Sequence, residues 1–148
     1  MGAAERVITG VMEGAPGLIH GLTCGAGMPY RLAEIAVRFG VHYYPIVSSG
    51  RAFNALWKRS FHKAPELLGG VVYEDPWRAG GHNGLSNTEN PLNPEDPYPR
   101  VLALRQVTRG FGMNDVPIIM AGGGRRREEG GDGSGNYEHG ASVVQCGT

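Results

Sequence analysis

The residues best suited to chemistry lie in one short glycine-rich motif, AGGHNG at 79–84. Glycine has no Cβ, so the backbone at Gly80 and Gly81 can closely approach a flat or anionic ligand. His82, directly behind them, is placed to exchange protons near neutral pH, because an unperturbed imidazole has a pKa of about 6.5. The motif alone is equally compatible with an ordinary loop whose histidine is merely solvated.

Two further glycine motifs each follow an apolar run: AGGG at 121–124 and QCGT at 145–148. Successive backbone N–H groups in such turns can bind a phosphate, and Thr148 adds a hydroxyl donor. Each motif by itself could also be a tight turn with nothing bound. The chain contains neither G-x-x-x-x-G-K nor G-x-G-x-x-G, so neither a P-loop nor a Rossmann site is indicated.

Short apolar runs alternate along the chain with stretches of helical spacing. We expect strands within 17–27, 41–49, 69–77, 116–124 and 141–148, and helices over 31–40, 51–68 and 100–112. This alternation predicts βαβ units around a parallel sheet whose two faces are both covered. The glycine and polar motifs follow the strands, and ligands of parallel α/β folds bind at those carboxyl ends. The expected fold class is α/β, a partial (β/α)8 TIM-type barrel of about five parallel βα units.

The composition is that of one globular domain spanning residues 1–148. Hydrophobic residues make up 41% of the chain and charged residues 19%, and 14 basic residues balance 14 acidic ones. The balance provides no long-range field for nucleic acid or an anionic membrane. No apolar run approaches the roughly 20 residues of a membrane helix, and no secretory signal pattern is present, so we expect a cytoplasmic protein.

Two other features complete the sequence-based picture. Cys24 and Cys146 are far apart and form no C-x-x-C pair, so we expect ordinary thiols and no metal site. Residues 124–140 are rich in glycine and lack apolar periodicity, which predicts a disordered loop.

Taken together, the motifs resemble the nitronate monooxygenase (2-nitropropane dioxygenase-like) family of FMN-dependent barrels. The resemblance is carried by the order of GAGMP at 25–29, AGGHNG, VPIIMAGG at 116–123 and QCGT. It covers residues 15 to about 123 and again 141–148. It implies that His82 is the base that takes a proton from a nitroalkane or orients a nitronate, and that FMN is the cofactor. The FMN-binding residues implied are Gly80, Gly81, Gly122, Gly123, Gln145, Cys146, Gly147 and Thr148.

The function implied by the resemblance is oxidation of nitronates or nitroalkanes with O2 to a carbonyl compound and nitrite. The partners would be these small molecules, with no nucleic acid and no membrane, and a homo-oligomer stays open. Two alternatives remain. One is a flavin-dependent enoyl-thioester reductase of similar fold, which would need NAD(P)H. The other is an inactive remnant that binds only a phosphate-bearing ligand.

The chain departs from the family pattern in four places, one of which is the missing helix after the last strand. Asp75 stands where the family usually has a glutamine ahead of the AGGH loop, and 124–140 replaces a helix, since each glycine costs a helix interior about 1 kcal/mol. The family's first strands have no counterpart before Gly17. The resemblance therefore implies a shortened form of the barrel.

Overall fold

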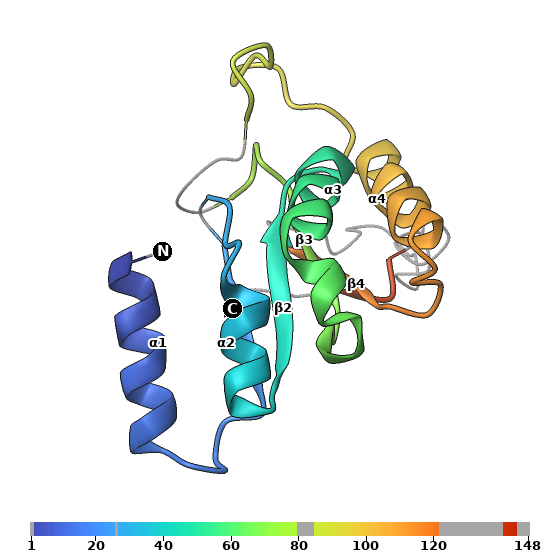
Figure 1. Cartoon of the computed structure of the whole chain (residues 1–148). Coiled ribbons are helices and arrows are strands. Elements are labelled where there is room, and N and C mark those ends of the chain that lie inside the picture. Colours follow the sequence, from blue (N-terminus) through green and yellow to red (C-terminus); the bar gives the residue numbers. More distant parts are fainter. Residues whose placement is uncertain (1, 26, 80–84, 122–140, 145–148) are drawn as a thin grey trace, which may run out of the picture.

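The structure, a computed structural model, describes residues 2–25, 27–79, 85–121 and 141–144 (Figure 1). Its helices are α1 (Gly2–Gly14), α2 (Leu32–Phe39), α3 (Gly50–Arg59) and α4 (Tyr98–Gly110), with short 3-10 helices η1 (Phe61–Lys63) and η2 (Pro65–Leu67). Its strands are β1 (Gly21–Cys24), β2 (His42–Val47), β3 (Val71–Glu74), β4 (Ile118–Ala121) and β5 (Val143–Val144). Each strand lies within an expected run, and α2, α3 and α4 overlap the expected helices.

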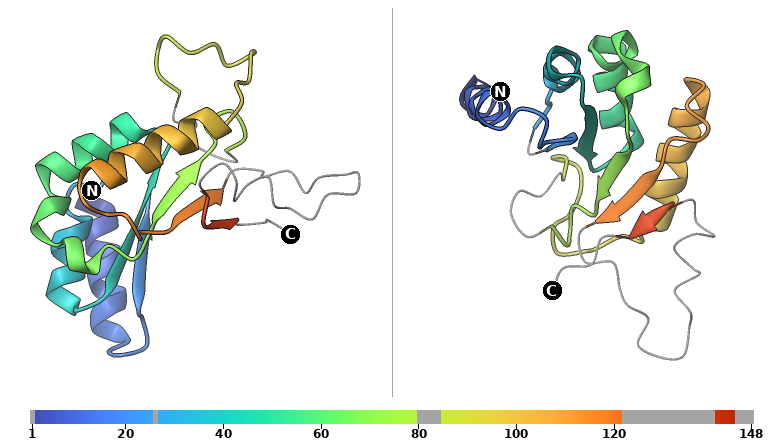
Figure 2. Two further views of the ribbon diagram at one scale, coloured as in Figure 1. Left: turned by 90° about the vertical axis from the view of Figure 1, so that its right-hand side faces the viewer. Right: turned by 90° about the horizontal axis from the view of Figure 1, so that it is seen from below.

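The five strands form one sheet in the order β1-β2-β3-β4-β5, and every neighbouring pair is parallel. The expected α/β architecture is therefore confirmed. Parallel neighbours need a connection that returns to the starting edge of the sheet. The helices α2, α3 and α4 lie within these return connections, and they form an outer layer around the curved sheet (Figure 2). The segment 124–140, predicted to be a loop, lies outside the described residues.

The hydrophobic core lies between the sheet and its helices. Because side chains alternate between the two faces of a strand, the residues on one face of the sheet are buried against α2, α3 and α4. The largest fully buried side chains include Tyr43, Tyr73, Phe53, Phe61, Leu56, Leu104 and Ile118. Trp57 of α3 stacks on Phe111 just after α4, with ring centroids 5.1 Å apart. Aromatic packing of this kind holds the two helices side by side, with α3 against β2 and α4 against β4.

The helix expected over 51–68 is shorter than predicted. It ends at Arg59, and the chain continues through η1 and η2. The hydroxyl of Tyr43 donates to the carbonyl oxygen of Ala64 at 3.1 Å, which gives this part of the chain a tertiary partner. Pro65 then begins η2, where proline has no N–H to continue an α-helical ladder. A buried tyrosine on a neighbouring strand therefore helps fix the path after α3, and sequence periodicity does not report such a contact.

The helix α1 is an element that the sequence pattern did not predict. It packs beside α2 (Figure 1), and Met12 is buried in the core. Glu5 of α1 forms an ion pair with Arg31 at 2.7 Å, and Glu13 forms one with Arg38 at 2.7 Å. These pairs are largely exposed, so each contributes little to stability. The main apolar contact of α1 with the core is therefore Met12, with Ile8 partly buried against the same core, whereas Val7 and Val11 are exposed.

The sheet face away from the helices is built around glycines that leave room for larger neighbours. A Cβ on Gly21 would lie 2.9 Å from Cε2 of Tyr44, and one on Gly70 would lie 3.3 Å from its Cδ1. A Cβ on Gly25, directly after β1, would lie 2.7 Å from Cβ of Ile46. Real Cβ atoms do not approach each other so closely. The parallel contact of β1 with β2 therefore depends on the missing side chain at Gly25.

Gly25→Ala should destabilise the fold by about 1–3 kcal/mol, the usual cost of forcing an extra methyl into a packed position. The clash is with the Cβ of Ile46, which cannot move without its backbone. Urea denaturation followed by circular dichroism measures this change in the free energy of unfolding.

The matched control is Gly10→Ala within α1, where an added Cβ would have nothing within 4 Å. It should stabilise the fold by up to about 1 kcal/mol, because alanine favours a helix interior over glycine. An unchanged stability of Gly25→Ala would mean that β1 and β2 are not in the register described.

Candidate active site at the carboxyl ends of the strands

The carboxyl ends of four neighbouring strands meet at one edge of the sheet. Cys24, Val47, Glu74 and Ala121 are the last residues of β1 to β4, and parallel pairing aligns these ends. The segment 85–97 projects beyond the same edge (Figure 1). Ligands of parallel α/β folds bind at this edge, so it is the candidate active site.

All the site residues predicted from sequence lie outside the described residues. They are Gly80, Gly81, His82, Gly122, Gly123, Gln145, Cys146, Gly147 and Thr148. Their described chain neighbours are nevertheless placed. Ala121 ends β4 and Val144 ends β5, and the two strands pair through Met120 opposite Val144. The chain therefore enters both glycine motifs from the candidate edge, on adjacent strands.

Asp75, which directly follows β3, makes hydrogen bonds within its own loop and to the end of β4. The side chain is only 2% exposed. Its carboxylate accepts the backbone N–H of Trp77 at 3.0 Å and lies 3.6 Å from Nε of Arg78. Its own backbone N–H donates to the carbonyl oxygen of Ala121 at 3.1 Å. Asp75 thus holds the start of the 75–79 segment against the end of β4.

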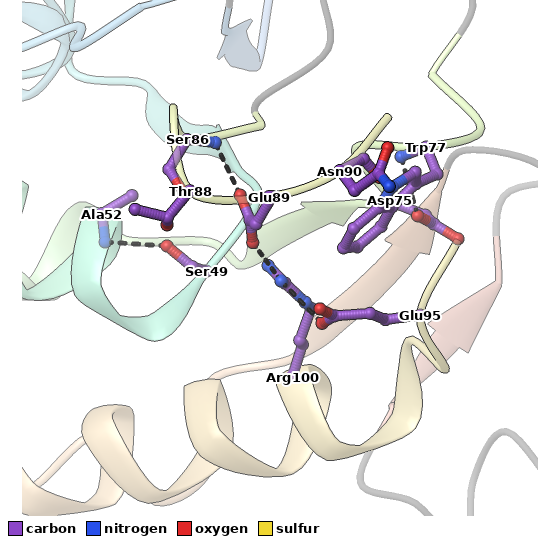
Figure 3. Close-up of polar contacts among 10 residues, drawn as sticks. All are labelled: Ser49, Ala52, Asp75, Trp77, Ser86, Thr88, Glu89, Asn90, Glu95 and Arg100. Carbon is purple, nitrogen blue, oxygen red and sulfur yellow. Dashed lines mark hydrogen bonds and ion pairs between the residues drawn. The ribbon is translucent and has the colours of Figure 1, made fainter. Parts of the chain in front are cut away.

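A second cluster, centred on Arg100 at the start of α4, holds the segment 85–97 (Figure 3). The Arg100 guanidinium pairs with Glu89 and, at 2.9 Å, with Glu95, and it lies 4.8 Å from the ring centre of Trp77. The indole N–H of Trp77 donates to the carbonyl oxygen of Asn90 at 2.9 Å. Trp77 and Arg100 therefore link the described residues before position 80 to those after position 84. The sequence analysis missed this cluster, whose members are spread over residues 77–100.

The carboxylate of Glu89 is the most strongly perturbed acid of this cluster. It accepts the backbone N–H of Ser86, and this hydrogen bond, with the bonds to Arg100, lowers the pKa of Glu89 to about 2. Charge-assisted hydrogen bonds favour the ionised form in this way. Beside the cluster, burial raises the pKa of the Tyr73 hydroxyl, with a smaller contribution from Asp75. The Tyr73 hydroxyl has no hydrogen-bond partner among the described residues.

Glu89→Gln should destabilise the fold at neutral pH and lose this effect in acid. The pKa of Glu89 in the folded state is about 2, below its ordinary value of 4.5. Its ionised form therefore stabilises the folded state above pH 4.5, and this contribution is lost as the pH falls through 2. Urea denaturation curves of the two proteins should differ at pH 7 and converge between pH 4.5 and 2.

Glu95→Gln is the control, because Glu95 contacts the same arginine while its side chain is 54% exposed. Its effect should be small throughout the pH range. A Glu89→Gln difference that stays constant down to pH 2 would show that the carboxylate is not held as described.

The architecture around this edge is that of part of a (β/α)8 barrel: parallel strands in sequential order, with helices on the outside. No protein-family model and no curated protein matches the sequence. Solved structures do match. FabK from Thermotoga maritima superposes with a TM-score of 0.64 at 19% identity, over 97% of this chain and 37% of that one.

Two other solved structures show the same likeness. A mutant of the same FabK gives a TM-score of 0.63 at 21% identity, over 97% of this chain and 39% of that one. Nitroalkane oxidase from Streptomyces ansochromogenes gives 0.60 at 16% identity, over 88% of this chain and 34% of that one. The likeness confirms the partial-barrel fold, and the chain spans between 34% and 39% of the length of these proteins.

Within the described ranges, no helix combines the length and the apolar character needed to cross a bilayer. In the same part of the chain, no three His, Cys, Asp or Glu side chains are grouped as metal ligands.

Proposed function

We propose that the carboxyl edge of this sheet is part of the active site of an FMN-dependent oxidoreductase that oxidises nitronates or nitroalkanes with O2 to a carbonyl compound and nitrite. The observation that carries the proposal is the pairing of β4 with β5, each of which ends directly before a glycine motif. In (β/α)8 barrels, the loops after two adjacent strands frequently form a phosphate site. The solved structures of similar fold, FabK and nitroalkane oxidase, are flavin-dependent oxidoreductases.

In this proposal the glycine motifs hold the phosphate of FMN. Backbone N–H groups at Gly122 and Gly123 would donate to the phosphate oxygens, together with those of residues 145–148 and the hydroxyl of Thr148. The backbone at Gly80 and Gly81 would approach the flavin ring, because neither residue has a Cβ. When bound, the flavin would supply the oxidation–reduction chemistry of the reaction.

His82 would act as the base. An imidazole nitrogen can take the proton from the carbon next to a nitro group, provided that the substrate is held within hydrogen-bond reach. The described residues on either side of the AGGH motif are held by hydrogen bonds of their own. Asp75 and Trp77 hold the chain before the AGGH motif, and Glu89 binds Ser86 after it.

The second candidate function is a flavin-dependent enoyl-thioester reductase, favoured by the likeness to FabK, an enoyl-ACP reductase. The two reactions differ in their second substrate. Consumption of O2 with a nitronate and without a nicotinamide would support the monooxygenase. Oxidation of NAD(P)H that depends on an enoyl thioester would support the reductase. A purified chain that retains no flavin would support the third alternative, an inactive remnant.

His82→Asn should lower turnover with a neutral nitroalkane by on the order of 10²–10⁴-fold, the usual cost of losing a general base. FMN binding should change little, because the phosphate contacts come from motifs distant in sequence. A pre-ionised nitronate needs no proton removed, so its turnover should fall much less. Steady-state O2 uptake with both substrates, beside an FMN titration, measures all three quantities. Equal losses with both substrates would show that His82 binds or orients the substrate and does not abstract the proton.

A further inference from the structure

Glu74 is a carboxylate at the candidate edge that lies on the face of the sheet away from the helices. Side chains at alternate positions of a strand share a face. A Cβ on Gly70 would lie 3.3 Å from Cδ1 of Tyr44 and 3.4 Å from Cδ1 of Ile119, so position 70 faces these side chains. Val72 and Glu74 follow on the same face. Tyr73 points the other way and is fully buried in the helix-side core.

The position of Glu74 along the strand brings it to the site. It is the last residue of β3, and its partner in the register is Ala121, the last residue of β4. The methyl group of Ala121 offers no hydrogen-bond donor. The Glu74 side chain is partly exposed, and none of the hydrogen bonds or ion pairs recorded among the described residues involves its carboxylate. In a (β/α)8 barrel, the carboxyl end of a strand, on the face away from the helices, lies at the ligand-binding end of the barrel interior.

The adjacent carboxylate, Asp75, provides the contrast. Its oxygens are occupied by the N–H of Trp77 and by Arg78, and it is buried on the opposite side of the chain. Asp75 therefore has a structural role that is complete without a ligand. The Glu74 carboxylate, in contrast, lies where it can contact a ligand that binds at the carboxyl edge of the sheet.

We propose that Glu74 determines substrate specificity at this site by repelling anionic substrates and favouring neutral ones. The inference rests on the proposed function, and it narrows the substrate class to the neutral nitroalkane in preference to the nitronate anion. Two like charges a few ångströms apart in a partly buried site repel each other strongly enough to change affinity by about tenfold or more. A neutral nitro compound of the same shape avoids this repulsion and leaves proton removal to the enzyme.

The experiment compares Glu74→Gln with the unmutated chain, both loaded with FMN. Glutamine keeps the size of the side chain and removes its charge. The probes are benzoate and benzamide, which have similar shapes and differ in charge, and their dissociation constants are measured from the change in flavin absorption. Glu74→Gln should tighten benzoate by about tenfold and leave benzamide within about twofold. The kcat/KM for a nitronate relative to its nitroalkane should rise in the same proportion.

Glu66→Gln is the matched control, because Glu66 is an exposed carboxylate in η2, before β3 and therefore toward the opposite edge of the sheet. It should leave the benzoate-to-benzamide ratio unchanged. Glu74→Ala is the second variant, and it should shift the ratio in the same direction as Glu74→Gln if the charge alone is responsible.

Three results would count against the account, and they are distinguishable. An unchanged ratio in Glu74→Gln, with FMN still bound, would overturn the role of Glu74 and leave the proposed function intact. An equal shift in Glu66→Gln would show a general effect of net charge and would also overturn it. An unmutated chain that retains no flavin would overturn the proposed function and the role of Glu74 together.

Discussion

Parallel pairing of the strands is the constraint on which the rest of the structure depends. Each strand must start again at the same edge, so the chain has to return across the sheet between β1 and β2, β2 and β3, and β3 and β4. The return segments contain α2, α3 and α4, which bury one face of the sheet. The same rule places every loop that follows a strand at the carboxyl edge. Fold and site therefore have one cause: a ladder of parallel hydrogen bonds supported by a layer of helices on one face.

The two faces of the sheet are specialised in different ways. The helix side is closed by large side chains such as Tyr43 and Tyr73. The other side combines glycines with partly exposed apolar residues, including Tyr44, Ile46 and Ile119. In a (β/α)8 barrel, the sheet face away from the helices is the barrel interior, and the present chain covers little more than a third of the length of the solved structures of similar fold. Glu74 is a charged residue at the carboxyl end of this face, where it can contact a bound ligand, whereas a charge on the outer surface of a helix cannot.

Sequence patterns predicted the elements that have strong local signals. The apolar runs around Tyr43, Val71 and Ile118 became β2, β3 and β4, because continuous apolar runs are typical of parallel strands. The expectation that both faces of the sheet are covered holds for one face only among the described residues, because Tyr44, Ile46 and Ile119 on the face away from the helices are partly exposed. Pro65 was a local signal against a helix that continues to residue 68, because proline cannot continue an α-helical ladder. The chain path between Arg59 and Pro65 carried no such signal, since it involves a contact of Tyr43 with a carbonyl group 21 positions away. The Arg100 cluster was missed for the same reason: its charges meet only after the loop has folded back. The roles of His82 and of the glycine motifs stay predictions, because those residues lie outside the described part of the chain.

The central claim is that the ends of β4 and β5 bind the phosphate of a flavin. Hydrogen–deuterium exchange of the chain with FMN, and with riboflavin as the control that lacks the phosphate, tests it directly. FMN should slow exchange in peptides containing the carboxyl ends of β4 and β5, and riboflavin at the same concentration should have a much smaller effect. Equal protection by both ligands, or protection confined to other parts of the chain, would contradict the phosphate site at this edge.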